Sequence, residues 1–432
     1  MKIKLLLFLF VFTFIASAQN ISIPDPVFKD LLLISYTNYN SDPNNFVVYP
    51  RIDANQDGEI SFTEALAVEG LDLGYSNITN LQGLQYFTNV KKISSYYADF
   101  PSFYQPTLVN LEQLSLLNSV GSSSTTIVDL SPHLNLKKFQ CNSSSLTSLD
   151  LSANTQLRDL DLYCPALTSL NLSNLSNLKN LSYLGALSTT DLSDAVNLLS
   201  LTCIGSTPNY TINQENLLTS IDLTNQNLLI SLDLTGNAIS SLDLSNCPNL
   251  ETLRISNNGI ETLILDNVNY VRQFFCSDNL LTSLNVDNMF NLKNFDCSNN
   301  QLSSLSTQNG IIEEYIYFSG NPDLESVCCD ANEVVYMQNL CNQYDNNSAI
   351  VNSNCESATG RIAMYPNPVN DVLHLTATEG ISKVEIYSIN GVQVMSSNAV
   401  SDSIEMNTLN SGMYFLKVFT NQEVYTMKFI KN

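Results

Sequence analysis

Residues 229–312 decide the fold of this chain. They can be written as four consecutive lines of 21 residues: LISLDLTGNAISSLDLSNCPN, LETLRISNNGIETLILDNVNY, VRQFFCSDNLLTSLNVDNMFN and LKNFDCSNNQLSSLSTQNGII. An apolar residue opens each line and recurs at its fourth and sixth places. Self-similarity at a fixed period of this length is typical of a solenoid, in which each repeat forms one coil and stacked coils bury a continuous core.

Asparagine occupies the ninth place of every line. At this place the strand ends and the chain turns, so backbone N–H and C=O groups face the core and must be paired. An amide side chain both donates and accepts hydrogen bonds, so we expect a column of asparagines to bridge successive coils. The column consists of Asn237, Asn258, Asn279, Asn300 and, one period later, Asn321.

A second apolar triplet follows the asparagine, as in Ile239, Leu242 and Leu244. This double pattern resembles the bacterial 21-residue leucine-rich repeats, which have two strand-like segments per coil. The resemblance covers residues 71–325 and implies a repeat solenoid of β-rich 21-residue leucine-rich repeats, with a parallel β-sheet horseshoe. Two insertions interrupt the spacing, and the one around Tyr210 is a candidate contact loop because solenoid insertions map to loops, often on a binding face.

The composition excludes some classes of partner. The chain has 41 acidic and 18 basic residues and a net charge of −23, which argues against nucleic acid and anionic membrane surfaces because both attract basic patches. Only 14% of the residues are charged, so the surface must consist mostly of Asn, Ser, Thr and Gln. Such a surface suits neutral polar ligands.

Residues 1–18 have the three parts of an export signal. Lys2 and Lys4 form a charged start, residues 5–15 an apolar run, and 16–18, Ala-Ser-Ala, a small-residue cleavage site. The run is too short to cross a bilayer as a stable helix, and no other apolar run approaches that length. We therefore expect a mature chain that begins at Gln19 and has no transmembrane segment.

Residues 19–70 are predicted to form an N-terminal cap. It begins with a helix opened by Pro26 and capped by Asp25. The segment DANQDGEISFTE, residues 53–64, then follows the pattern of a calcium-binding loop, with Gly58 at the sharp turn. The candidate ligands are Asp53, Asn55, Asp57, Glu59 through its carbonyl, Ser61 through a water, and Glu64.

No helix leads directly into this loop, because residues 44–51 are predicted to be extended. The segment therefore resembles a dockerin-like half hand more than a paired EF-hand. The alternative is a turn rich in Asp and Asn that caps a helix starting near Phe62 and holds no metal. Calcium is the one cofactor that the sequence suggests, and its expected role is to stiffen the cap.

Side chains between the inward-pointing places are expected to line the concave sheet. Near its C-terminal end they include aromatic rings beside carboxylates and amides, which would suit a sugar or a peptide. The alternative is a set of ordinary outward residues without a ligand. The candidates are Arg254, Arg272, Phe275, Asp296, Tyr315 and Tyr317.

The cysteines form two groups. Cys141, Cys203, Cys276 and Cys297 take the sixth, inward place of their repeats, where we expect free core thiols, although the last two lie on neighbouring strands within bonding range. A second group follows the last repeat and is predicted to staple a cap, residues 326–355, through two disulfides of open connectivity. Zinc is an alternative there, although vicinal cysteines do not fit C-x2-C spacing. This group is Cys328, Cys329, Cys341 and Cys355.

After a polar linker, residues 356–363, the repeat gives way to short alternating strands. Asn390-Gly391 is a strong hairpin signal. Residues 364–432 therefore predict a small antiparallel, immunoglobulin-like β-sandwich.

MYPNPVNDVLHL, KVEIYSINGVQV, LNSGMYFLKV and the terminal KFIKN closely resemble the type A C-terminal sorting domain of the bacterial type IX secretion system. The resemblance implies passage across the outer membrane by the type IX machinery. It also implies removal of the domain in or near the linker, followed by release or attachment to the outer surface. The matching family positions are Pro366, Asn367, Pro368, Gly391, Gly412, Tyr414 and Lys428.

The sequence contains no catalytic constellation. Its two histidines, His133 and His374, fall in different predicted modules, so no Ser-His-Asp or Cys-His arrangement is assembled. Asp150 and Asp161 belong to a recurring aspartate place of the repeat and are not a dedicated acid pair. We expect a monomeric, adhesin-like, non-enzymatic protein that binds protein or glycan at the cell surface. The alternative is a structural component of the surface or matrix without a specific ligand.

Overall fold

The computed structural model describes residues 19–39, 48–75, 78–96, 102–117, 126–205, 217–353, 362–365, 369, 371–377, 380–388, 392–397, 403–420 and 424–431. The predicted export signal, residues 1–18, and the loop around Tyr210 lie outside these residues. Contacts divide the chain into two compact units, Met1–Glu325 with Asn339–Ala349 and Ser326–Gln338 with Ile350–Asn432. Within the described part, no helix is both long and apolar enough to pass through a membrane.

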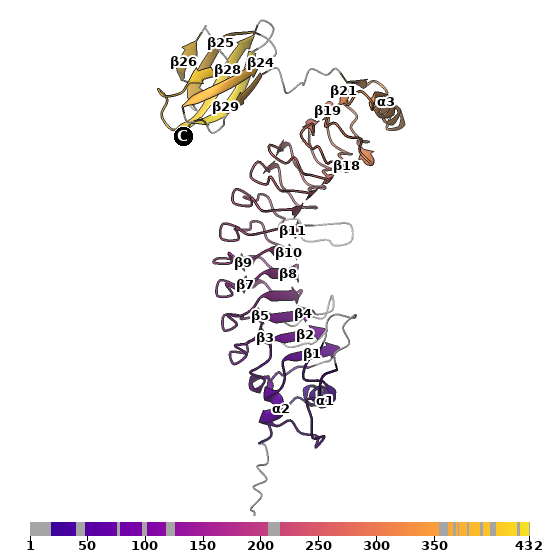
Figure 1. Ribbon diagram of the computed structural model, residues 1–432, viewed down its shortest axis with the longest axis vertical. Coiled ribbons are helices and arrows are strands. Elements are labelled where there is room, and N and C mark those ends of the chain that lie inside the picture. The colour runs from indigo at the N-terminus through magenta and orange to yellow at the C-terminus, as the bar shows by residue number, and fades with distance from the viewer. Residues whose placement is uncertain are drawn as a thin grey trace, which may run out of the picture. The chain divides into compact units, whose positions relative to one another are not determined.

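The first unit is a solenoid whose coils stack in one direction (Figure 1). Each coil adds one strand to a parallel sheet of 12 strands, in sequence order. Equivalent places of consecutive repeats pair, as Leu232 does with Leu253 and Phe274 with Phe295, so the predicted parallel solenoid is confirmed. The strands are β1 (Gly70–Tyr75), β2 (Lys92–Tyr96), β4 (Gln113–Leu117), β6 (Lys138–Asn142), β8 (Asp159–Cys164), β10 (Asn180–Gly185), β11 (Ser200–Ile204), β12 (Ser231–Asp233), β14 (Thr252–Arg254), β16 (Gln273–Phe275), β18 (Asn294–Asp296) and β20 (Tyr315–Tyr317).

The second apolar triplet of each repeat forms shorter strands elsewhere on the coil. They pair in parallel between consecutive coils. Both sets point their central residues inward: Leu253 and Leu242 are buried. The pairs are β3 (Ser102–Phe103) with β5 (Ile127–Val128), β7 (Ser148–Asp150) with β9 (Ser169–Asn171), β13 (Ser241–Asp243) with β15 (Thr262–Ile264), and β17 (Ser283–Asn285) with β19 (Ser304–Thr307).

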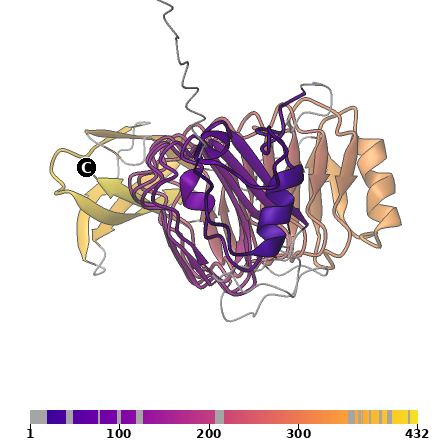
Figure 2. The ribbon, with the colours of Figure 1, turned by 90° about the horizontal axis from the view of Figure 1, so that it is seen from below.

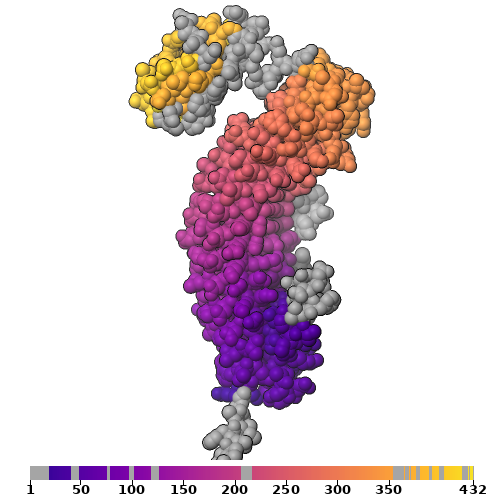
Figure 3. Space-filling model, in the orientation of Figure 1, coloured from indigo at the N-terminus to yellow at the C-terminus, as the bar shows by residue number. Residues whose placement is uncertain are grey.

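The core of the solenoid is continuous because each coil buries its apolar places against the next. Phe274 and Phe295 are fully or almost fully buried and stack with ring centroids 5.5 Å apart. The space-filling view shows consecutive coils in direct contact along the stack (Figure 3). Burial of aromatic and aliphatic side chains at a fixed period therefore holds the coils in register.

The N-terminal cap contains two short helices that lie over the first coil (Figure 2). Helix α1 spans Pro26–Ile34 with Asp25 as its N-cap, as predicted. Helix α2 spans Phe62–Leu66 with Ser61 as its N-cap, and the short 3-10 helix η1, Leu84–Tyr86, follows β1. The ring of Phe62 meets that of Tyr86 edge-on at 4.9 Å, so the cap packs directly on the coil.

The segment after the last repeat contains β21 (Ser326–Cys329), α3 (Val334–Gln343) and β22 (Ile350–Asn352), and β21 pairs with β22 in parallel. Cys328 is disulfide-bonded, whereas Cys329 and Cys341 are buried and form no disulfide in the described part of the chain. The prediction that this cluster forms two disulfides is therefore wrong. Cys329 instead lies in the core, with its Sγ 3.9 Å from the Asn352 carbonyl, and Cys355 lies outside the described residues.

The C-terminal module is a small antiparallel β-sandwich, as predicted. The order of one sheet is β23-β24-β27, and that of the other is β26-β25-β28-β29. Its core includes Leu373, Val384, Leu416 and Phe429, all fully buried. The strands are β23 (Ile362–Tyr365), β24 (Val372–Ala377), β25 (Ile381–Ser388), β26 (Gln393–Ser397), β27 (Ser403–Glu405), β28 (Gly412–Thr420) and β29 (Val424–Lys431).

Candidate functional site

The ninth-place asparagines bridge consecutive coils through both ends of the amide. In Asn258 the amide nitrogen donates to the carbonyls of Leu234, 3.0 Å away, and Ile255, and the amide oxygen accepts from the Ile239 N–H at 3.2 Å. Leu234 and Ile239 belong to the preceding coil. Asn237, Asn279, Asn300 and Asn321 repeat the pattern, so these side chains serve the scaffold.

A second asparagine ladder runs along the outer turns and was missed by the sequence reasoning. Asn110 donates to the Thr88 carbonyl at 3.0 Å, Asn177 to the Thr155 carbonyl and Asn249 to the Asn227 carbonyl. Each of these asparagines stands directly before the apolar residue that opens a repeat. The recurring Asn-Leu pair, as in 110–111 and 249–250, was the signal that could have predicted it.

The predicted ligand-binding residues lie on the outward face of the 12-stranded sheet, between β12 and β20. We call the outward face of all 12 strands the sheet face. Strand register places Asp233, Arg254, Phe275, Asp296 and Tyr317 in one column. The parallel column holds Ser231, Thr252, Gln273, Asn294 and Tyr315. Arg272, exposed just before β16, belongs to neither column.

Arg254 connects the two columns. Its guanidinium lies 5.1 Å from the centroid of the Phe275 ring and donates to the Gln273 side-chain oxygen at 2.9 Å. A planar cation over an aromatic face is favourable, and the hydrogen bond fixes its orientation. Arg254 therefore presents a defined charge to solvent.

The end of the sheet face carries two exposed tyrosines. Tyr315 is 59% exposed and Tyr317 is 49% exposed, and both side chains project outward from β20 while Ile316 between them is buried. Beside them, Asp296 accepts hydrogen bonds from the Ser298 backbone N–H at 3.0 Å and from its hydroxyl. An oriented carboxylate thus stands next to two rings available for stacking.

The rest of the same face, toward the N-terminus, is polar and bonded within itself. The Ser94 hydroxyl donates to Asp72 at 3.1 Å, and the Asn180 amide donates to Asp159 at 2.6 Å. Strands β6 to β11 enclose a shallow depression of about 320 Å3 lined mainly by such groups. These side chains form hydrogen bonds with one another, so this part of the face offers a ligand fewer hydrogen-bonding groups than the end with Tyr315 and Tyr317.

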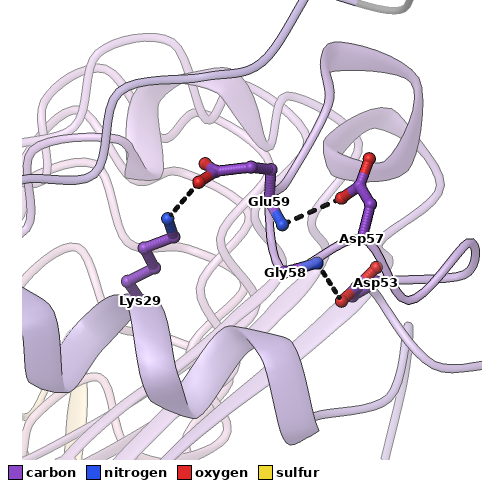
Figure 4. A network of polar contacts seen from close by, with 5 residues as sticks. All are labelled: Lys29, Asp53, Asp57, Gly58 and Glu59. Atoms are coloured by element: carbon purple, nitrogen blue, oxygen red, sulfur yellow. Dashed lines mark hydrogen bonds and ion pairs between the residues drawn. The ribbon is translucent and has the colours of Figure 1, made fainter.

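The predicted calcium loop, residues 53–64, follows α1 along the chain and ends in the first turn of α2. Figure 4 shows its polar contacts beside Lys29 of α1. Asp53 is only 6% exposed; its Oδ2 accepts from the Gly58 N–H at 3.2 Å, and its buried Oδ1 has no partner among the described residues. The Asn55 Oδ1 accepts from the Asp57 N–H, and Asp57 Oδ1 accepts from the Glu59 N–H at 2.9 Å. The left-handed turn falls on Gln56 and Gly58, with φ of 59° and 79°.

Glu59 and Glu64 face different partners. The Glu59 carboxylate pairs with Lys29 of α1 at 2.7 Å, which leaves its backbone carbonyl as the group it could offer to a metal (Figure 4). Glu64 forms a capping box with Ser61, and its Oε1 accepts from the Ala54 N–H at 2.9 Å. Burial raises the pKa of Glu64, but the hydrogen bonds from Ser61, Ala54 and Asn55 outweigh it and hold that pKa below its usual range.

No three carboxylate, imidazole or thiolate side chains in the described part of the chain converge as a metal site. In residues 53–64 a third carboxylate, that of Glu64, does not join those of Asp53 and Asp57 because it caps α2. Asp53 and Asp57, with the Asn55 amide and the Glu59 carbonyl, form a mixed set of oxygens. Such a set fits a hard cation.

The inward cysteines of the repeats are buried free thiols. Burial raises the pKa of Cys203 to about 12 and raises that of Cys276 well above its ordinary value. A thiol with a raised pKa is a poor nucleophile and metal ligand. Cys164, which the sequence left unassigned, is also buried, with its Sγ 3.7 Å from the Cys141 carbonyl.

The acidic and histidine side chains of the repeats have structural partners. His133 is fully buried and its Nδ1 lies 3.1 Å from the Leu108 carbonyl. Asp150 accepts from the Ser152 N–H at 2.9 Å, which, with further hydrogen bonds, keeps the pKa of Asp150 below its usual range despite partial burial. A glycosidase general acid needs a raised pKa, so Asp150 is suited to capping a turn.

The C-terminal module matches a known family. Residues 363–432 match the family model described as a secretion system C-terminal sorting domain. This domain indicates type IX secretion and export to the cell surface or the extracellular space. Of the family positions, Tyr414 stacks on Phe429 at 5.6 Å, Gly412 opens β28 and Lys428 lies on β29. Pro366, Asn367, Pro368 and Gly391 lie outside the described residues.

Solved structures similar to this one include two proteins from Listeria monocytogenes. The functional domain of InlJ, which includes a cysteine ladder, is 19% identical, with 87% of this chain and 93% of that chain covered and a TM-score of 0.42. The internalin InlF is 17% identical, with 70% and 95% covered and a TM-score of 0.44. A leucine-rich repeat protein of Leptospira interrogans is 16% identical, with 71% and 100% covered and a TM-score of 0.37. No curated protein matches the sequence.

Proposed function

We propose that this chain is an exported, non-enzymatic leucine-rich repeat protein that binds an extracellular protein or glycan on the sheet face. One observation carries the proposal: the exposed Tyr315 and Tyr317 stand beside the oriented carboxylate of Asp296. Export supports it, because the sorting domain directs the solenoid to the place where such ligands occur.

The chemistry of this patch favours a polar ligand with a flat apolar surface. Aromatic rings provide contact area at low conformational cost, and their faces accept the C–H surface of a sugar ring or an aliphatic side chain. Asp296 and Arg254 add one acceptor and one donor of opposite charge.

The placement of the titratable groups supports a binder rather than an enzyme. His133 is enclosed in the solenoid core and His374 lies on β24 of the C-terminal module. The recurring aspartates hold turns, and burial raises the pKa of the Cys203 and Cys276 thiols. Function in this fold therefore depends on the residues that the sheet presents outward.

The test is a binding screen of the mature chain, from Gln19, against glycan and extracellular-protein arrays. Any ligand found is then tested against the double variant Tyr315→Ala/Tyr317→Ala. Loss of one stacked ring costs about 1 kcal/mol beyond its buried area, so we expect at least a ~10-fold loss of affinity. The matched control is Tyr270→Ala, since Tyr270 is 58% exposed but lies outside the sheet strands. Equal loss in the control, or none in the double variant, would contradict the proposal.

The second candidate is a structural component of the surface or matrix layer. The observation that favours it is the self-bonded polar part of the sheet face, where Ser94 donates to Asp72 and Asn180 to Asp159. Groups that satisfy one another gain little from a ligand. A screen without any saturable ligand, together with retention of the protein in the surface layer, would favour this candidate.

A further inference from the structure

The cap contains a loop whose polar groups the binding function does not use. Residues 53–64 are fixed at both ends: the Ile52 N–H donates to the Ser35 carbonyl at 2.9 Å, and the Ile21 N–H donates to the Ile60 carbonyl at 2.8 Å. Ile52 and Ile60 are buried and anchor the loop from within. The loop is therefore preorganised rather than a free surface segment.

One carboxylate oxygen inside this loop lacks a partner. Only 6% of the surface of Asp53 is exposed, so the residue is more than nine-tenths buried. Its Oδ1 nevertheless accepts no hydrogen bond from any described residue. Leaving a charged acceptor buried and unsatisfied is costly. A bound cation is a direct way to satisfy such an oxygen, because its charge opposes that of the carboxylate.

The other potential metal ligands around Asp53 are oxygen atoms, which calcium prefers. Among the described residues, Asp57 Oδ2 contacts the Asn55 amide alone, at 2.8 Å, and Asn55 carries its own carbonyl oxygen. Lys29 holds the Glu59 carboxylate to one side at 2.7 Å, so the Glu59 backbone carbonyl would serve as the ligand. Calcium takes six to eight such ligands in flexible geometry, whereas magnesium requires a near-ideal octahedron.

Glu64 is the residue whose position must change. Its Oε2 accepts from the Ser61 N–H at 2.9 Å and from the Ser61 hydroxyl at 2.8 Å. Both carboxylate oxygens of Glu64 are thus engaged by the backbone of the loop and the start of α2. To coordinate a cation at the twelfth place, this carboxylate has to give up these bonds.

We propose that residues 53–64 bind one calcium ion, with Asp53 as the central ligand, and that Glu64 joins the ion by leaving the capping box of α2. Because Glu64 loses its hydrogen bonds when it binds the ion, the net free energy of calcium binding is less favourable. The affinity therefore belongs to the weak class typical of extracellular modules, with a Kd on the order of 10⁻⁴–10⁻³ M. Calcium in that range stiffens the cap after export.

The test is calorimetric titration of the full mature chain with calcium chloride, accompanied by thermal melts. We expect about one ion per chain and a Tm that rises with calcium concentration, because a ligand that binds only the folded state stabilises it. The same titration with magnesium chloride is expected to give at least ~10-fold weaker binding. Absence of binding at millimolar calcium, or equal binding of magnesium, would overturn the proposal.

Substitutions in the loop test whether the calcium ion binds at Asp53 and Asp57. Asp53→Asn keeps an acceptor for the Gly58 N–H but removes the charge, and Asp57→Asn keeps an acceptor for the Glu59 N–H while it removes the charge of an exposed residue. Both are expected to weaken calcium binding at least ~10-fold. Asp150→Asn is the control, because Asp150 also accepts a backbone N–H but lies in the solenoid, outside the loop. Unchanged affinity in both loop variants, or an equal loss in the control, would place the ion elsewhere.

The role of Glu64 has its own readout. Glu64→Gln retains an oxygen that can accept from the Ser61 N–H and preserve the cap of α2. We expect its Tm without calcium to stay close to that of the wild type, while calcium affinity falls at least ~10-fold. Wild-type calcium affinity in this variant would show that Glu64 stays in the capping box and is not a ligand.

Discussion

At the residue scale, the ninth-place asparagines show why one amino acid recurs with the repeat. Asn300 donates to the carbonyls of Cys276 and Cys297, both at 3.1 Å, and accepts from the Leu281 N–H at 3.1 Å. Only an amide offers donors and an acceptor on one short side chain without charge. The side chain replaces backbone hydrogen bonds that the turn cannot make.

We expect Asn279→Ala or Asn300→Ala to lower the free energy of unfolding by about 1–3 kcal/mol, because each leaves buried backbone groups unsatisfied. Urea unfolding followed by circular dichroism measures the change. Asn246→Ala is the control, since Asn246 is exposed and its amide contacts, within the described part of the chain, the Ser245 hydroxyl alone, at 3.4 Å. Unchanged stability in both ladder variants would contradict the bridging role.

His133 is a second residue whose burial has a consequence. Its Nδ1 bonds the Leu108 carbonyl, its Nε2 is buried without a partner in the described part of the chain, and the Phe103 ring lies 5.9 Å away. Burial lowers the pKa of His133 below its ordinary value of 6.5, although the Leu108 hydrogen bond and the charge of Asp129 oppose the shift. The folded protein therefore holds this histidine neutral.

This burial predicts loss of stability in mild acid. The unfolded chain binds a proton near pH 6.5 and the folded chain binds it only at lower pH, so stability is complete above about pH 6.5 and falls as the pH drops below it. The slope is at most about 1.4 kcal/mol per pH unit.

Unfolding free energies of the wild type and of His133→Leu between pH 8 and pH 5 test this expectation. Leucine suits the place because Leu175 fills the equivalent buried position two coils further on. The variant keeps every other titrating group, so the difference between the two curves isolates His133. Parallel curves would contradict the prediction.

At the scale of elements, one carboxylate links helix α1 to the first coil by hydrogen bonds. Asp25 Oδ1 accepts from the Val27 and Phe28 N–H groups at the start of α1. Its Oδ2 accepts from the Thr79 and Asn80 N–H groups, both at 3.0 Å. A single carboxylate thus caps the helix and fixes it to the solenoid.

We expect Asp25→Ala to cost about 1–2 kcal/mol of stability from the loss of the helix cap alone. The lost bonds to Thr79 and Asn80 add to this cost. Thermal unfolding measures the change, and Asp30→Ala, an exposed substitution on the same helix, is the control. An effect no larger than that of the control would show that the cap is held by apolar packing alone.

At the scale of the whole molecule, the chain combines a repeat solenoid with a C-terminal sorting domain. The C-terminal sorting domain indicates export, and the solenoid supplies a long sheet with outward side chains. The acidic composition, with a net charge of −23, keeps the exported chain away from anionic surfaces.

Deletion of residues 364–432 is expected to leave the protein in the periplasm, since the sorting domain directs passage across the outer membrane. Cell fractionation with immunoblotting measures the distribution in the native host. Deletion of the linker, residues 356–363, is the control for a shortened chain. Surface delivery of the 364–432 deletion at the wild-type level would contradict this role.

The sequence by itself determined the solenoid, because its period of 21 residues allows apolar side chains to be buried only between stacked coils. It also determined the helix cap at Asp25 and the sorting module, whose signals are local. The expected asparagine column needed only the recurrence of Asn258 and its equivalents.

Only the tertiary structure decided which polar groups are free. Glu64 is engaged by the capping box while Asp53 Oδ1 has no partner among the residues that the structure describes. Cys329 lies buried against the Asn352 carbonyl rather than in a second disulfide. Tyr315 and Tyr317 stand exposed, while Asp72 and Asp159 are bonded by neighbours on the adjacent strand. A repeat pattern specifies which places point inward, but hydrogen-bond partners from adjacent coils decide which outward groups remain for a ligand.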